Sequence, residues 1–428
     1  FLLLLICCQI AAAEDDPHSF SEPDKARVTH LDLDLKVDFE NRRLVGTATW
    51  DFERTSGDEI VFDIKDMQIR SVESNGQLLP FRIGPQNKLA LLGQPLIVEL
   101  PADVEQVSIN YATRPEAAAL QWLEPVQTAG KKHPFLFTQS QAILARTWIP
   151  CQDTPGVRFT YDAKLEVPKN LLALMSATNP TELNSSGVYT FEMPQAIPSY
   201  LMAMAVGDLR FRSLGEVTGI YAEPSELEAA AYEFADTEKM VTAVEGMYGP
   251  YRWGRYDMLV LPPSFPFGGM ENPRLTFLTP TVIAGDRSLT SLIAHELAHS
   301  WSGNLVTNET WNDFWLNEGF TVYLERRIME ELYGESYATM RAQLGYGDLT
   351  HTLKEIEQED SKLKLDLQGR DPDEGLTDIA YEKGYFFLTS LEKQVGREKF
   401  DRFLRNYFDD NAFGTLNTER FLERVERE

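Results

Sequence analysis

Leu292-Ile-Ala-His-Glu-Leu-Ala-His-Ser-Trp301 holds two histidines four residues apart, with a glutamate directly after the first. Residues four apart share one face of a helix, so the rings of His295 and His299 can converge on one metal ion while Glu296 points beside it. The flanking sequence predicts this helix, with Asp286 or Ser288 as its cap, Leu289, Leu292, Ile293 and Leu297 as a buried stripe, and Gly303 at its end. The spacing is the HExxH signature of a zinc site.

The third ligand of such a site is expected further along the chain, because catalytic zinc usually has three protein ligands and a water molecule. Glu318 fits, in a second predicted helix capped at Asn312 or Asp313 that can lie against the first. A carboxylate inside the apolar, tryptophan-rich run of residues 311–323 would be costly to bury without a metal or a charged partner. We therefore expect one zinc ion per chain, bound by the two histidines and Glu318.

The first residues of the chain are an apolar run followed by three alanines and the acidic stretch Glu14-Asp-Asp-Pro17. This order is typical of a secretory leader, residues 1–13, with cleavage after Ala13. We expect an exported protein, periplasmic or secreted, with a cytoplasmic location as the alternative. No other apolar run approaches the length of a membrane span. Beyond residue 13 the only cysteine is Cys151, so no intrachain disulfide is expected.

The composition restricts the class of protein. With 66 acidic against 40 basic residues, the net charge of −26 argues against nucleic-acid binding and for a well-solvated surface. The acidic residues are dispersed. A chain of 428 residues with 43% hydrophobic content can bury large cores and is expected to form two or three domains.

An alternating pattern in the first half predicts β-structure. Leu31, Leu33, Leu35, Val37 and Phe39 alternate with mostly polar residues, and after a turn at Glu40-Asn41 the same rhythm returns from Leu44 to Phe52. This is an antiparallel hairpin with one buried face. Further short strands are predicted near residues 59–64, 96–100, 106–111, 159–167, 187–192 and 201–206. We expect an all-β domain over residues 14–212.

The pattern changes after about Ser213, where the strand rhythm fades between Leu214 and Glu223. Helical spacing begins after Pro224, and residues 256–261 read as a strand. The following segment, 262–273, is rich in proline and cannot be helical, and its Gly268-Gly269 lets the backbone approach a ligand closely. Separate blocks of strands and helices predict an α+β multidomain protein, with a mostly helical domain over residues 213–428 and a cleft between the blocks.

The motifs together resemble the aminopeptidase N-like gluzincins, with the closest likeness to the leukotriene hydrolase and aminopeptidase B branch. They span residues 137–384 and are Gln139-Ser-Gln-Ala142, Pro150-Cys-Gln-Asp-Thr-Pro155, Gly268-Gly-Met-Glu-Asn272, His295-Glu-x-x-His299, Trp315-Leu-Asn-Glu-Gly319 and Tyr381-Glu-Lys-Gly384. The resemblance implies a thermolysin-like catalytic domain and a zinc-dependent aminopeptidase that acts on peptides with a free N-terminal amine.

Residue roles follow from the resemblance. It implies that Glu296 is the general base, Tyr381 stabilises the oxyanion, and Glu271 binds the α-amine of the substrate. Gln141, Gly268, Gly269 and Met270 fall on substrate-binding positions. Glu325 is left open between orienting a ligand histidine and forming a plain surface salt bridge.

Two departures from the family pattern define the alternatives. The resemblance implies a helical C-terminal domain, which we expect to be missing from a sequence that stops at Glu428. Asp373 matches an aspartate of the leukotriene hydrolase, but Leu376 stands where that enzyme has a tyrosine. The alternatives are a bifunctional epoxide hydrolase and aminopeptidase, or an inactive zinc scaffold.

Overall fold

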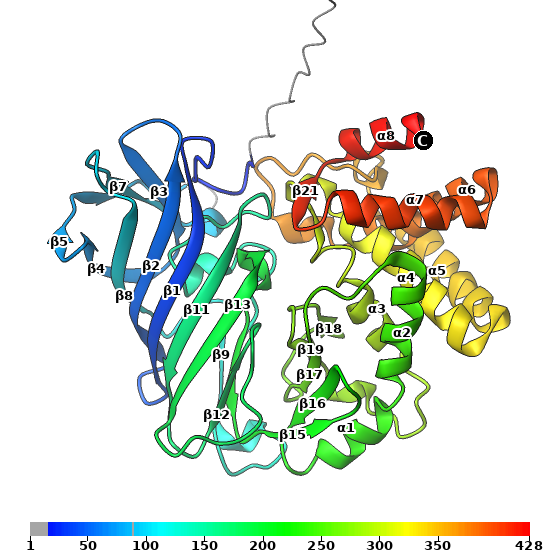
Figure 1. The fold of residues 1–428 in the computed structure, drawn as a ribbon, viewed down its shortest axis with the longest axis horizontal. Helices are drawn as coiled ribbons and strands as arrows, with labels where there is room; N and C mark the ends of the chain where they lie inside the picture. Colours follow the sequence, from blue (N-terminus) through cyan, green and yellow to red (C-terminus); the bar gives the residue numbers. More distant parts are fainter. Residues whose placement is uncertain (1–15, 88–89) are drawn as a thin grey trace, which may run out of the picture.

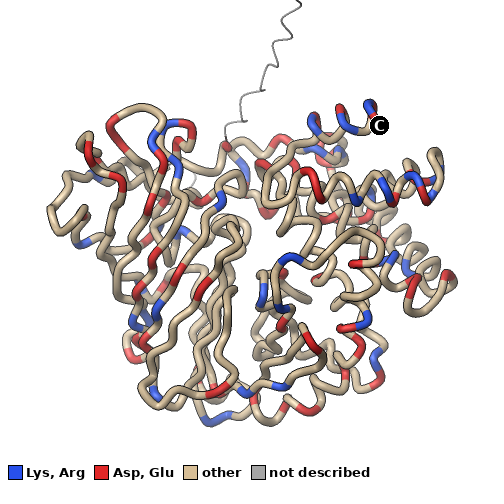
Figure 2. Tube along the Cα trace, viewed as in Figure 1, with Lys and Arg blue, Asp and Glu red and all other residues tan. Residues whose placement is uncertain are grey.

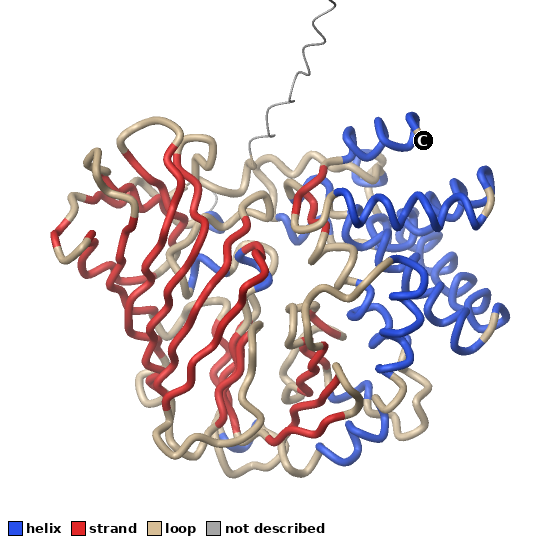
Figure 3. The backbone as a smooth tube through the Cα atoms, in the orientation of Figure 1, coloured by secondary structure: helices blue, strands red, loops and turns tan. Residues whose placement is uncertain are grey.

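The computed structural model of the protein describes residues 16–87 and 90–428. Strands dominate the first half of the chain and helices the second, and the two halves lie side by side (Figure 3). The predicted α+β arrangement, a β-rich part followed by a mostly helical part, is confirmed. The predicted leader, residues 1–13, lies outside the described residues, and export stays a prediction.

The predicted hairpin is the centre of the β-rich part. Strand β1 (Ala26–Asp38) pairs antiparallel with β2 (Arg43–Arg54), and Leu31 lies opposite Trp50. Every second residue of β1 from Leu31 to Val37 is buried. The alternating pattern therefore identified both the pairing and the buried face.

Three sheets build this part, which is on the left in Figure 1. The seven-stranded sheet has the order β13 (Val188–Pro198), β11 (Arg158–Glu166), β1, β2, β8 (Gln106–Thr113), β4 (Met67–Ser74) and β5 (Gln77–Leu78), and only β1 and β11 pair in parallel. The four-stranded sheet is β12 (Leu172–Met175), β14 (Met204–Gly207), β10 (Phe135–Thr138) and β9 (Leu120–Leu123). The three-stranded sheet is β3 (Glu59–Ile64), β7 (Gln94–Glu99) and β6 (Phe81–Ile83). The predicted strands are present with shifted ends; for example, the strand expected at 201–206 begins at Met204.

The second part begins with a five-stranded sheet that the sequence pattern did not predict in full. Its order is β15 (Arg210–Ser213), β16 (Thr218–Ala222), β17 (Tyr256–Val260), β19 (Thr276–Leu278) and β18 (Gly269–Met270). The expected loss of strand structure between Leu214 and Glu223 is wrong, because β16 lies there. All five residues of β16 are buried, and a strand covered on both faces shows no alternation. The domain boundary near Ser213 stays a prediction.

Helices cover the rest of this part, as predicted. They are α1 (Leu227–Glu233), α2 (Thr237–Tyr248), α3 (Ser291–Ala298), α4 (Trp315–Tyr333), α5 (Glu335–Glu355), α6 (Gly384–Val395), α7 (Arg397–Asp410) and α8 (Thr418–Arg427), and β20 (Val306–Asn308) pairs with β21 (Gly414–Leu416). Acidic and basic residues are interspersed over both parts (Figure 2). Among the described residues no helix is long and apolar enough to span a membrane.

A buried charge cluster fixes the segment that leads from β10 to β11. The guanidinium of Arg146 is fully buried and donates from Nε to Oδ2 of Asp153 at 2.8 Å. It also donates to the carbonyls of His18 and Leu92, at 2.7 and 2.9 Å. Asp63, 3.9 Å from the guanidinium, accepts the backbone N–H of Asp153 at 2.9 Å. One arginine therefore joins four separate segments of the chain.

We predict that Arg146→Ala lowers the free energy of unfolding by about 3–5 kcal/mol, because it leaves two buried carboxylates without their cation. Urea denaturation of the two proteins measures the loss. Lys164→Ala is the control, because the pair of Lys164 with Asp34 is exposed on the sheet surface and should leave the midpoint nearly unchanged. Equal midpoints for Arg146→Ala and wild type would contradict the prediction.

Candidate metal centre and active site

Helix α3 brings the two histidines together. Its buried residues Ile293 and Leu297 pack into the core, and the rings of His295 and His299 lie on one face with centroids 4.9 Å apart. The helix begins later than predicted, because residues 285–290 form turns. Thr290 is at the cap position without a side-chain cap bond.

Several details predicted for this helix are therefore wrong. Asp286 and Ser288 do not cap it; instead Oδ1 of Asp286 accepts the backbone N–H of Ser288 in the preceding turn. Leu289 is 47% exposed and is not part of the buried stripe. Gly303 lies beyond the helix end at Ala298, in a turn where its φ of 98° favours glycine.

Helix α4 supplies Glu318 from its first turn. The predicted caps Asn312 and Asp313 are wrong, since they precede the helix in a short 3-10 turn. Their side chains hold other parts of the chain: Asn312 accepts the backbone N–H of Leu367 at 3.0 Å, and Asp313 accepts that of Thr418 at 2.9 Å. Both side chains therefore accept hydrogen bonds from residues far along the chain and do not cap α4.

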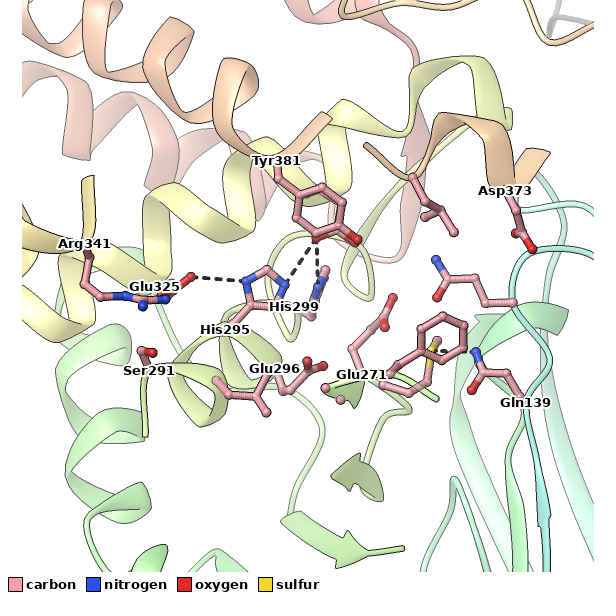
Figure 4. Close-up of a pocket in the computed structure, with 18 residues that line it drawn as sticks. Gln139, Glu271, Ser291, His295, Glu296, His299, Glu325, Arg341, Asp373 and Tyr381 are labelled. Carbon is pink, nitrogen blue, oxygen red and sulfur yellow. Dashed lines mark hydrogen bonds and ion pairs between the residues drawn. The ribbon is translucent and has the colours of Figure 1, made fainter. Parts of the chain in front are cut away.

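Three side chains form a cluster with the geometry of a metal site. Nε2 of His295 and Nε2 of His299 lie 3.3 and 3.5 Å from Oε2 of Glu318. These atoms lie within 4.8 Å of one another, and the contacts are drawn in Figure 4. Oε2 of Glu318 is buried and accepts no well-directed hydrogen bond among the described residues. A divalent cation would satisfy this oxygen and both nitrogens.

The other ring nitrogens are already engaged, which leaves both Nε2 atoms facing Glu318. Nδ1 of His295 lies 3.3 Å from Oε2 of Glu325. Nδ1 of His299 lies 3.0 Å from the carbonyl of Ser302 and 3.1 Å from Oγ1 of Thr321. Such partners fix the ring orientation of ligand histidines and make them better donors. The donor set therefore fits zinc.

Glu325 fits the first of the two interpretations that the sequence left open, and the plain surface salt bridge is wrong because the carboxylate is buried. Its Oε2 contacts His295, and its Oε1 lies 3.5 Å from Nη2 of Arg341. The carboxylate is buried. It therefore orients a candidate ligand and pairs with an arginine at the same time.

The electrostatics of the site favour a cation. Burial raises the pKa of Glu296 to about 7. Burial alone would lower the pKa of His299, but the carboxylates of Glu271 and Glu318 outweigh it and raise that pKa to about 9. Burial opposes ionisation of Glu318 as well, yet the two histidines hold its pKa near 2. Carboxylates crowded in a buried space thus attract positive charge.

Tyr381 lies over the cluster on a π-helical turn, Ile379–Lys383, just before α6. Its ring stacks on that of His295 with centroids 6.2 Å apart. Nη2 of Arg326 donates to both carboxylate oxygens of the next residue, Glu382, at 2.7 and 2.8 Å. Gly319 and Gly384 face each other so closely that a Cβ on Gly319 would lie 2.7 Å from Cα of Gly384. These two contacts hold the tyrosine turn against α4.

A cleft passes over the cluster and brings together the other predicted site residues. Gln141, Gly268, Gly269, Met270 and Glu271 line it together with Glu296 and Tyr381. Oε1 of Glu271 is buried without a hydrogen-bond partner among the described residues. A Cβ on Gly269 would lie 2.3 Å from Oε1 of Glu296, so glycine leaves room for that carboxylate.

Other residues of the site were missed by the sequence analysis. Ser302 and Thr321 orient His299, and the position of Thr321 three residues after Glu318 on one helix could have indicated it. Ser291 and Arg341 line the cleft. Arg341 belongs to α5, and no local pattern distinguishes it from an ordinary surface arginine.

Comparisons with known proteins identify a family for both parts of the chain. A model of the peptidase family M1 domain matches residues 232–428, and one of the peptidase M1 N-terminal domain matches residues 27–201. The chain is 45% identical over 421 residues to leukotriene A-4 hydrolase of Xenopus laevis, covering 95% of this chain and 69% of that protein. It is 43% identical over 423 residues to leucine aminopeptidase 2 of Yarrowia lipolytica, covering 96% and 65%.

Solved structures agree with the sequence comparison. Yeast leukotriene A4 hydrolase in complex with bestatin superimposes with a TM-score of 0.92 at 38% identity, covering 97% of this chain and 67% of that one. The chain thus spans about two thirds of the length of these relatives.

We predict that Glu325→Ala weakens binding of a divalent metal ion about tenfold to a hundredfold, because His295 loses the carboxylate that orients it. Metal retained by the protein at graded chelator concentrations measures the affinity. Glu331→Ala removes an exposed carboxylate from the same helix and is the matched control. Retention curves that coincide for wild type and Glu325→Ala would exclude this role.

Proposed function

The chain belongs to the peptidase family M1, and we propose that it is a zinc-dependent aminopeptidase that releases N-terminal amino acids from peptides. The observation that carries the proposal is the meeting of His295, His299 and Glu318 beside Glu296 in one cleft. Zinc held there by these three residues, one ion per chain, would lower the pKa of a water molecule and polarise the carbonyl of the scissile peptide bond.

Glu296 acts as the general base in this proposal. Its carboxylate lies next to the metal ligands on α3, and Gly269 leaves space around it. A carboxylate held beside the metal ligands, with space around it, can accept a proton and then release it. Glu296 takes a proton from the attacking water and passes it to the leaving amine.

Tyr381 stabilises the oxyanion that develops on the attacked carbonyl. Burial, followed by the nearby carboxylates of Glu318 and Glu271, raises the pKa of its phenol well above the usual value. The phenol therefore keeps its proton at neutral pH and can donate a hydrogen bond to the oxyanion. The π-helical turn Ile379–Lys383, which is held against α4, fixes the orientation of this tyrosine.

Glu271 binds the protonated α-amine of the substrate. Its buried Oε1 has no partner among the described residues, so an ammonium group would supply the missing hydrogen bond. The amine held there places the first peptide carbonyl over the metal ligands. This restricts cleavage to the N-terminal residue.

The remaining cleft residues position the substrate backbone. Gly268 and Gly269 permit close approach of the peptide, and Met270 and Gln141 form part of the wall. The cleft has a volume of about 330 Å³, which lies at the small end of the range for ligand sites. Short peptides are therefore the substrates that the space accommodates best.

Two alternatives concern the same site. Epoxide hydrolysis has support from the leukotriene A-4 hydrolase relative, and Asp373 lines the cleft. Leu376, which also lines the cleft, offers no hydroxyl where the leukotriene hydrolase has a tyrosine. A scaffold without catalysis would not require the presence of both Glu296 and Tyr381.

We predict that the protein cleaves peptides with a free N-terminus and barely cleaves the same peptides after N-acetylation. Glu271→Ala should lower kcat/KM for the free peptides about tenfold to a hundredfold, because a charge-assisted hydrogen bond contributes about 1.5–3 kcal/mol. Zinc content should not change, since Glu271 is not a ligand. Chromatography of the products together with metal analysis measures both quantities.

Glu296→Gln is the companion variant. It should bind zinc and lose nearly all turnover, which separates an enzyme from a scaffold. Equal hydrolysis of free and acetylated peptides would replace the aminopeptidase by an endopeptidase.

A further inference from the structure

The proposed reaction defines the direction in which a bound peptide lies in the cleft. Figure 4 shows Glu271, Gln139 and Asp373 on one side of the two histidines, and Glu325 and Arg341 on the other. An amine held at Glu271 places the first residue of the substrate on the Glu271 side. The part of the peptide that is released must then extend past His295 toward Arg341.

Arg341 is the only lysine or arginine among the described residues that line the cleft. The other charged side chains there, apart from the histidines, are the carboxylates of Glu271, Glu296, Glu318, Glu325 and Asp373. These carboxylates repel an anionic group on the substrate. Apart from the proposed zinc ion, Arg341 is therefore the cation among the described lining residues that could attract a carboxylate of the substrate.

The guanidinium of Arg341 has hydrogen-bonding capacity to spare. Its side chain is 36% exposed, and its one ion pair within residues 16–87 and 90–428 is the contact of Nη2 with Oε1 of Glu325 at 3.5 Å. Nε is buried without a hydrogen-bond partner among the described residues. A guanidinium has five N–H donors, so it can hold a second carboxylate while it contacts Glu325.

The backbone at this position is held in place. Nη2 of Arg326 donates to the carbonyl of Arg341 at 3.4 Å, and the guanidinium of Arg326 stacks on the ring of Tyr385 at 3.9 Å. Arg341 thus extends into the cleft from a fixed point on α5.

We propose that Arg341 binds a carboxylate on the released part of the substrate and so gives the enzyme a preference for short acidic-ended peptides. This inference rests on the aminopeptidase function proposed above, because that function defines the direction of the peptide. The carboxylate is either the C-terminus of a short peptide or the acidic side chain of its second residue.

The test measures binding without turnover, in the zinc-loaded full-length protein carrying Glu296→Gln. Calorimetry with Leu-Ala and Leu-Ala amide compares a free C-terminal carboxylate with a neutral end. Leu-Glu amide carries its carboxylate on the side chain alone. Each peptide is titrated into Glu296→Gln and into the same protein with Arg341→Gln, Arg341→Lys or Lys354→Gln added.

We expect at least one of the two carboxylate peptides to bind about ten times more tightly than Leu-Ala amide, because a charge-assisted hydrogen bond is gained. Arg341→Gln should abolish that ratio, and Arg341→Lys should keep part of it, since it retains the charge without the planar fork. Lys354→Gln removes an exposed cation from the same helix and should leave the ratio unchanged. The peptide that shows the gain identifies the source of the carboxylate.

A ratio near one in Glu296→Gln alone, or an equal ratio after Arg341→Gln, would overturn the proposal. Failure of the aminopeptidase function itself would show separately, as absence of turnover of any free-amine peptide by the wild type.

Discussion

The site depends on the buried contact of Glu318 with two histidines. Its Oε2 faces Nε2 of His295 at 3.3 Å and Nε2 of His299 at 3.5 Å. Glu271, Glu296 and Glu325 are buried around the same cluster. Burying several carboxylates in one small space is costly unless a cation compensates them. The raised pKa of His299, about 9, reflects the same negative field. A divalent metal ion resolves this conflict, and the chemistry proposed for the site follows from its charge.

Helix α4 positions the groups of the site relative to one another. It carries Glu318, the orienting carboxylate of Glu325 and, one residue later, Arg326, which binds Glu382 beside Tyr381. Gly319 on the same helix permits the close approach of Gly384. The candidate ligand, the group that orients His295 and the candidate oxyanion donor therefore share one rigid support. Such a shared support explains how Arg326 and Glu382, 56 residues apart in the sequence, can be held in a fixed relation.

Local patterns in the sequence predicted the parts of the fold that depend on periodicity. The β1–β2 hairpin was found because one face of it is buried and the other is polar, whereas α3, which is buried almost throughout, was found from the spacing of its two histidines. Strand β16 was missed because it is buried throughout. The predicted caps Asn312 and Asp313 failed because their side chains bind residues far along the chain. These errors arise from tertiary contacts, which leave no local signal.

The same distinction holds for the site. His295, His299 and Glu318 were found from motif spacing, whereas Arg341 was missed because its position in the cleft depends on how α5 packs against α4. The most direct test of the account is X-ray diffraction from crystals of the zinc-loaded protein on both sides of the zinc absorption edge. The account predicts one anomalous peak about 2.0–2.2 Å from Nε2 of His295, Nε2 of His299 and an oxygen of Glu318. No peak there, or a peak only at another cluster such as His30, Asp32 and Asp162, would contradict it.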